Sequence, residues 1–101
     1  MNNTTYWTVP VDHPAFAGHF PGTPILPGVV LLDTVIHSIA AATGIALDLC
    51  EISSVKFLSP VSPGNELVIH HTILANGTIR FDIEEGMRKI ASGSILMRSP
   101  V

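Results

Sequence analysis

The residues best suited to chemistry lie in the first third of the chain, beginning with His19. This histidine stands in a stretch crowded with proline and glycine that runs from Gly18 to Gly28. A general base must be held in a fixed position, and prolines restrict the backbone that would hold it. Glycines allow a ligand to approach the backbone closely. The pattern therefore predicts that His19 is a general base, although a lone loop histidine can also be incidental.

Asp33 is a carboxylate inside the most apolar part of the chain, the stretch from Ile25 to Leu47. Two readings are open. Asp33 can lie on a solvated stripe of a helix, or it can be buried. Burial disfavours the charged form and raises the pKa of a carboxyl group, so a buried Asp33 would keep its proton and could act as a general acid.

His37 and Gly28 flank Asp33 at informative distances. His37 is four residues further on and would share a helix face with Asp33, so we interpret it as a hydrogen-bond partner that orients the acid in preference to a catalytic group. Gly28 stands where a helix should start, and the first N–H groups of a helix have no partner within it. There it could stabilise negative charge developing on an acyl carbonyl oxygen, or it could be an ordinary helix-start glycine.

The elements that must position these residues follow from periodicity and turn signals. A helix is predicted over residues 29–43, opened by Pro27 and Gly28 and closed by Gly44. Strands are predicted before and after it, with hairpin turns at Asn76-Gly77 and Glu85-Gly86. The predicted strands span residues 4–11, 51–58, 66–74, 78–84 and 88–98.

The predicted architecture is one α+β domain over residues 1–101, an antiparallel sheet around one long helix. The sequence predicts a helix that is apolar on every side, and such a helix must be covered on every side. One sheet can cover only part of it, so we expect the sheet to curl and a second copy of the chain to close the rest. The sequence thus predicts a dimer.

Composition excludes several classes of function. The net charge of −3 argues against nucleic acid as the main partner. Cys50 is the single cysteine, so no disulfide framework is expected and a cytoplasmic location is predicted. Neither a signal peptide nor a membrane span is expected, since Asp33 at the centre of a span would cost about 2.5–3.5 kcal/mol. No metal is predicted, because His70 and His71 should point to opposite faces of a strand, and no cofactor motif is found.

The segment "HPAFAGHFPGTPILPGVVLLD", residues 13–33, closely resembles the active-site segment of the 3-hydroxyacyl-[acyl-carrier-protein] dehydratases, the FabA/FabZ-type hot-dog family. The later "VKFLSPVSPGNEL" is similar to the strand-turn-strand of that family. The resemblance implies a dimeric hot-dog fold that removes water from a 3-hydroxyacyl thioester carried by acyl carrier protein. Short members of this kind look like ApeI-like dehydratases of specialised pathways, such as those for aryl-polyene or other polyketide-like lipids.

The resemblance also implies a role for each matched residue. His19 would remove the proton next to the carbonyl, Asp33 would protonate the departing hydroxyl, and the Gly28 amide would polarise the carbonyl. The residues expected to contact substrate are Phe20, Pro21, Gly22, Pro27, Val29 and His37. Separately, the basic residues Lys56, Arg88 and Lys89 are predicted to dock the acidic carrier protein.

Three features depart from the family pattern. The acid is Asp33, as in the isomerising FabA branch, where the FabZ branch has Glu; His37 stands where the family usually has Gln; and the chain is short. Two alternatives therefore remain. One is a hot-dog thioesterase or an enoyl-CoA hydratase. The other is a weakly active subunit that pairs with a related chain. An assembly larger than a dimer also stays open.

Overall fold

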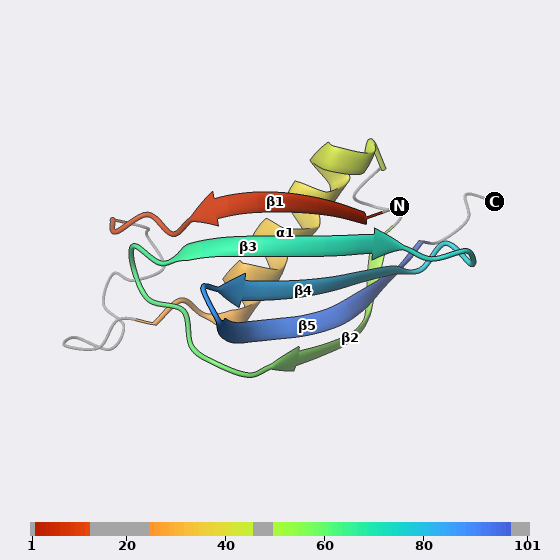
Figure 1. Ribbon diagram of the computed structural model, residues 1–101. Helices are drawn as coiled ribbons and strands as arrows, with labels where there is room; N and C mark the ends of the chain where they lie inside the picture. Colours follow the sequence, from red (N-terminus) through yellow and green to blue (C-terminus); the bar gives the residue numbers. More distant parts are fainter. Residues whose placement is uncertain (1, 13–24, 46–49, 98–101) are drawn as a thin grey trace.

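The computed structural model describes residues 2–12, 25–45 and 50–97 (Figure 1). The described elements are, in chain order, β1 (Asn2–Thr8), α1 (Gly28–Thr43), β2 (Cys50–Phe57), β3 (Glu66–Ile73), β4 (Ile79–Glu85) and β5 (Arg88–Met97). The predicted order of one strand, one helix and four further strands is confirmed. The prediction for the first strand was wrong at its end, because β1 stops at Thr8 and not at Val11.

The strands form one antiparallel sheet in the order β1-β3-β4-β5-β2, so that β1 and β2 are its edges (Figure 1). Both predicted turns are present. Gly77 (φ 87°) and Gly86 (φ 60°) adopt the left-handed backbone that such turns require, and the Gly77 N–H donates to the Leu74 carbonyl oxygen at 3.0 Å. The two turns fix how β3, β4 and β5 lie side by side.

The helix crosses one face of this sheet (Figure 1). It begins after Pro27, whose φ of −59° suits a helix start, and ends at Gly44, whose φ of 75° is left-handed. The Gly44 N–H donates to the Ala40 carbonyl oxygen at 2.8 Å. The predicted start and stop signals are therefore confirmed.

The core lies between α1 and the sheet. Leu31, Val35 and Ile39 form the buried side of the helix. On β4, buried and exposed side chains alternate as predicted. The buried apolar residues are Val9, Leu26, Leu31, Val35, Ile39, Val61, Leu67, Ile69, Ile79, Phe81, Ile83, Ile90, Ala91 and Ile95.

The sheet covers only part of α1, as expected for the single chain, but the uncovered part of the helix is not apolar throughout. Val29, Asp33 and His37 recur every four residues and form an exposed stripe opposite the buried side of the helix. Because 3.6 residues make one turn, a spacing of four keeps these side chains on one face. The exposed stripe is thus mixed, with an apolar, an acidic and a titratable side chain.

Candidate active site

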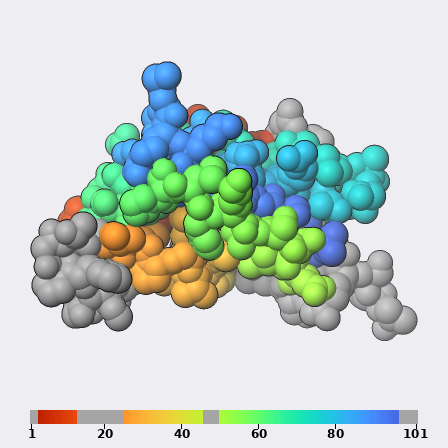
Figure 2. All heavy atoms as spheres, turned by 90° about the horizontal axis from the view of Figure 1, so that it is seen from below, coloured from red at the N-terminus to blue at the C-terminus, as the bar shows by residue number. Residues whose placement is uncertain are grey.

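An apolar hollow of about 460 Å³ lies at the start of α1. In Figure 2 the start of the helix (orange) and β2 with the segment after it (green) lie side by side on the face seen from below. The hollow is lined by Leu26, Gly28, Leu31, Phe57, Leu58, Ser59, Pro60 and Val61. We call this cavity the Gly28 hollow. Its walls come from two segments that are about thirty residues apart in sequence.

Gly28, the first residue of α1, lines this hollow. The N–H groups of Val30 and Leu31 both donate to the Pro27 carbonyl oxygen, at 3.0 and 3.2 Å. Gly28 and Val29 precede them and have no carbonyl to reach within the helix. The positive end of the helix dipole lies at the same place. An oxygen acquiring negative charge beside Gly28 would be stabilised there.

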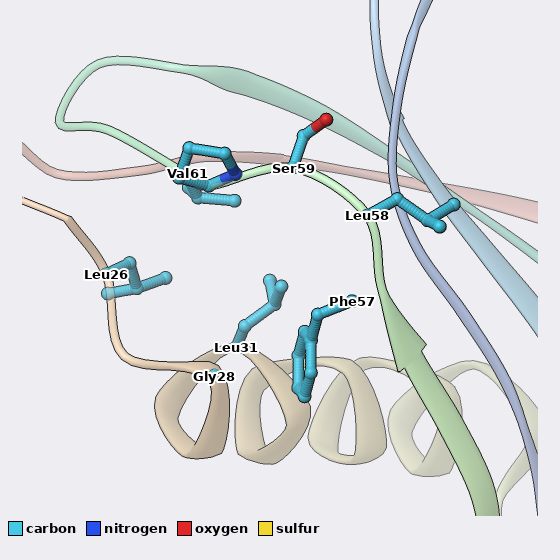
Figure 3. Close-up of a pocket in the computed structure, with 8 residues that line it drawn as sticks. Leu26, Gly28, Leu31, Phe57, Leu58, Ser59 and Val61 are labelled. Atoms are coloured by element: carbon cyan, nitrogen blue, oxygen red, sulfur yellow. The ribbon is translucent and has the colours of Figure 1, made fainter.

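Phe57, at the end of β2, packs directly on Gly28. A Cβ atom placed on Gly28 would lie 2.8 Å from Cζ of Phe57, closer than real Cβ contacts allow. In Figure 3 the ring of Phe57 stands beside α1, and Leu26 and Leu31 face the same space. Phe57 is only half-buried. A glycine at this position therefore allows the Phe57 ring to pack closely on the start of the helix.

Sequence reasoning missed Phe57 as a site residue. The signal available was an aromatic residue just before the proline-rich turn "SPVSPGN". That signal says nothing of contact with Gly28, because the contact depends on how β2 is placed against the helix.

Asp33 is exposed, with 74% of its side chain accessible. For the single chain, this favours a solvated position on the helix over a buried one. His37 lies one turn further on, and its Nδ1 donates to the backbone carbonyl oxygen of Asp33 at 2.7 Å. The carboxylate Oδ1 is 3.4 Å from the same nitrogen. The predicted pairing of these residues is thus made mainly through the backbone.

Asp33 does not line the Gly28 hollow of its own chain. Leu31 faces the hollow, and Asp33 follows it by two residues, which is about 200° round the helix. The structure therefore brings Gly28, Leu31 and Phe57 together and directs Asp33 elsewhere. His19, Phe20, Pro21 and Gly22 lie outside the described residues. Pro27 is the residue at the helix boundary, and Val29 is exposed.

The basic residues predicted to dock a carrier protein differ in their surroundings. Lys56 on β2 and Lys89 on β5 are exposed. The guanidinium group of Arg88 instead bonds within the chain, to Glu85 and to the Pro60 carbonyl oxygen. Arg88 thus holds the segment that forms one wall of the Gly28 hollow.

The two adjacent histidines of β3 point to opposite faces of the sheet. His70 is exposed and its Nε2 lies 3.9 Å from Oε2 of Glu84. His71 is 2% exposed, and its Nδ1 has no hydrogen-bond partner within the described structure. Burial lowers the pKa of His71 below its ordinary value of 6.5.

The described residues contain neither a metal-binding cluster nor a membrane-spanning helix. No group of three or more His, Cys, Asp or Glu side chains there is arranged to hold a metal ion. Within the same ranges, α1 is not long and apolar enough to span a membrane.

The fold and the hollow define the class of protein. One helix packed on a five-stranded antiparallel sheet is the hot-dog architecture that the resemblance implied. Residues 2–94 match the ApeI-like family, described as ApeI dehydratase, and the chain belongs to this family.

Individual relatives agree with this assignment. The FabZ 3-hydroxyacyl-[acyl-carrier-protein] dehydratase of Jannaschia sp. (strain CCS1) is 38% identical over 73 residues, which are 63% of this chain and 45% of that protein. The chain therefore spans about half the length of the curated relatives it matches.

Two solved structures resemble the whole chain. The dehydratase heterocomplex ApeI:P from Xenorhabdus doucetiae matches with a TM-score of 0.80 and 27% identity, over 97% of this chain and 88% of that one. An uncharacterized protein from Erwinia carotovora subsp. atroseptica matches with a TM-score of 0.74 and 32% identity, over 99% and 84% of the two chains.

Proposed function

We propose that this chain dehydrates a 3-hydroxyacyl-[acyl-carrier-protein] thioester to the trans-2-enoyl thioester, in fatty-acid or polyketide-like lipid biosynthesis. The observation that carries this proposal is the Gly28 hollow, where helix-start N–H groups without an acceptor inside the helix adjoin an apolar cavity. Such a place suits a thioester carbonyl with an apolar acyl chain beside it. Membership of the ApeI-like family supports the choice of reaction.

The proposed reaction is a balanced elimination that needs no cofactor. His19 removes the proton from the carbon next to the carbonyl. The electron pair of the broken C–H bond forms the new double bond. The bond to the hydroxyl on the next carbon breaks, and Asp33 supplies the proton with which the hydroxyl leaves as water. The Gly28 N–H stabilises charge on the carbonyl oxygen while the first proton is in transit.

We further propose that the site is completed by a second subunit. Asp33 lies on the exposed stripe of α1, away from the Gly28 hollow of its own chain. The edge strand β2 is also exposed, and Ile52 and Phe57 on it are large apolar residues open to solvent. A second hot-dog chain placed along this edge would cover the apolar residues and could bring its own Asp33 to the hollow. Exposed apolar groups of this kind mark interfaces.

The second subunit can be another copy or a related chain. The solved relative from Xenorhabdus is a heterocomplex, and this supports retaining the heterodimer as an alternative to the homodimer. The cytoplasmic location and a docking role for Lys56 and Lys89 belong to this proposal as well. The engagement of Arg88 with Glu85 and Pro60 leaves less of that guanidinium for a carrier protein.

The test is turnover of a panel of 3-hydroxyacyl substrates, each supplied on acyl carrier protein and on CoA, with the purified chain. We expect the enoyl chromophore to appear with the thioester intact, and a lower KM on the carrier protein. Lys56→Glu should raise KM for the substrates on acyl carrier protein and leave KM for the CoA substrates unchanged. Release of free thiol would point to a thioesterase instead. Folded chain that is inactive alone but active with a related subunit would establish the heterodimer.

A further inference from the structure

Arg88 is the centre of a hydrogen-bonded cluster next to the Gly28 hollow. Its Nε and Nη2 donate to Oε1 of Glu85, at 3.2 and 3.1 Å. Its Nη1 donates to the carbonyl oxygen of Pro60 at 2.9 Å, and Nη2 also reaches Oδ1 of Asn65 at 3.4 Å. Asn65 closes the cluster by donating from Nδ2 to Oε2 of Glu85 at 3.1 Å. The β4–β5 turn is thereby joined to the segment between β2 and β3.

That segment spans residues 58–65, and its first four residues form one wall of the Gly28 hollow. Its start is held by β5, since the N–H groups of Leu58 and Ser59 donate to the carbonyl oxygen of Ile90. Near its end the Ser62 N–H donates to Oδ1 of Asn65 at 2.8 Å. Between these anchors lies Pro60, which has no N–H and can be held through its backbone only by its carbonyl oxygen. Arg88 is the group that bonds this oxygen.

The next residue along the segment contacts the start of the helix. The carbonyl oxygen of Val61 accepts a hydrogen bond from the N–H of Leu26 at 2.8 Å. Leu26 precedes Gly28 by two residues, with Pro27 between them. Val61 and Leu26 are both buried and both line the hollow. A shift of Pro60 would therefore move Val61, and through the Leu26 bond it would move the Gly28 amide.

We propose that Arg88 is a positioning residue, which holds the Pro60–Val61 backbone so that the Gly28 N–H is correctly placed at the hollow. This inference rests on the proposed function, in which that N–H polarises the thioester carbonyl. Glu85 and Asn65 orient the guanidinium from the other side. The role differs from the carrier-docking role predicted from charge, because it depends on the planar fork of arginine and not on its charge alone.

The exposure of the cluster argues that overall stability is not its main contribution. The side chains of Arg88 and Glu85 are 40% and 32% accessible, and ion pairs this exposed contribute little to unfolding free energy. Small displacements of a group that acts on the transition state, by contrast, can cost up to about a hundredfold in rate. Loss of Arg88 should thus be seen in local order and in kcat more than in melting temperature.

The test compares Arg88→Met, Arg88→Lys and Glu85→Gln in the full-length protein. Arg80→Lys, an exposed arginine on β4, is the matched control. The first readout is independent of activity: amide hydrogen exchange of Leu26 and the NMR resonance of the Gly28 amide. In Arg88→Met we expect Leu26 exchange to rise about tenfold or more and the Gly28 resonance to shift, with exchange at Val35 in the middle of α1 unchanged. Arg88→Lys should show changes in the same direction, since lysine keeps the charge but loses the fork that bonds Glu85 and Pro60 together.

The second readout is kinetic. In Arg88→Met we expect kcat to fall about tenfold or more with KM changed less than about threefold, because the Gly28 N–H acts mainly in the transition state. Unchanged Leu26 exchange in Arg88→Met would overturn the proposal, as would a uniform rise in exchange along all of α1, which would indicate a merely structural role. Raised KM with unchanged kcat would indicate carrier docking. If the wild-type chain lacks dehydratase activity, the proposed function fails, and the exchange measurement still decides whether Arg88 positions Gly28. Should Arg88→Met not fold, Arg88→Lys and Glu85→Gln carry the same comparison.

Discussion

Nδ1 of His37 lies 2.7 Å from the backbone carbonyl oxygen of Asp33 and 3.4 Å from its carboxylate Oδ1. A carbonyl oxygen only accepts hydrogen bonds, so Nδ1 carries the hydrogen. Both side chains are largely exposed in the single chain. His37 is therefore tied to the helix backbone beside Asp33, and it can influence the carboxylate without being required to hold it.

His37→Gln should keep most of the activity. Glutamine can donate a hydrogen bond through its amide, as His37 does through Nδ1. We expect kcat within about fivefold of wild type. The measurement is kcat and KM of the purified variant beside those of wild type. Complete loss of activity in a folded protein would instead give His37 a direct catalytic role.

Asp33→Asn should abolish most turnover while the fold persists. The substitution keeps the shape but removes the transferable proton, so we expect kcat to fall by about a hundredfold or more. Since Asp33 is exposed in the single chain, unfolding of the separated subunit should be little affected. A near-normal rate would show that Asp33 is only a surface carboxylate.

Mixing variants tests whether two subunits share each site. If the chain is a homodimer, His19→Ala and Asp33→Asn should each be inactive alone and regain activity when unfolded and refolded together. Random pairing makes half of the dimers mixed, and each mixed dimer has one intact site. Activity should therefore approach about a quarter of wild type. Mixed dimers detected by mass without any recovery would place both residues in one subunit's site.

Gly28→Ala should impair the site through Phe57. The new Cβ would lie 2.8 Å from Cζ of Phe57, and the half-exposed ring can move away more easily than the helix can. We expect kcat/KM to fall about tenfold with little change in melting temperature, because the displaced ring lies half-exposed at the surface. Adding Phe57→Leu should restore part of the activity. Strictly additive losses in this double-mutant cycle would show that the contact is not what limits the variant.

His71 should make the protein less stable in acid. Burial lowers its pKa below 6.5, so the unfolded chain takes up a proton at a higher pH than the folded chain does. Above the unfolded pKa the effect is absent. As the pH is lowered from the unfolded pKa to the folded pKa, the unfolding free energy should decrease by up to about 1.4 kcal/mol per pH unit. Denaturant unfolding from pH 7.5 to 4.5 measures this slope. His71→Leu should reduce it, whereas the exposed neighbour variant His70→Gln should not; equal slopes in wild type and His71→Leu would refute the assignment.

The sequence by itself determined the elements and much of the candidate chemistry. Pro27 and Gly44 bound the helix, Gly77 and Gly86 make the turns, and alternation along β4 marks its buried face. These features could be predicted because each depends on backbone preferences and side-chain periods within a few residues. The spacing of Asp33 and His37 likewise predicted their contact. The chemical candidates His19, Asp33 and Gly28 came from residue type and from the resemblance.

Only the tertiary structure decided which of these residues meet. Phe57 lies against Gly28, and Arg88 reaches Pro60, across about thirty residues of sequence in each case. Such contacts depend on strand order and on the angle at which the helix crosses the sheet. Neither can be predicted from the periodicity of side chains within one element. The same holds for Asp33. Its sequence context left both burial and exposure open. A helix packed on one sheet buries one side, and in this fold that side carries Leu31 and Val35, so Asp33 faces outward.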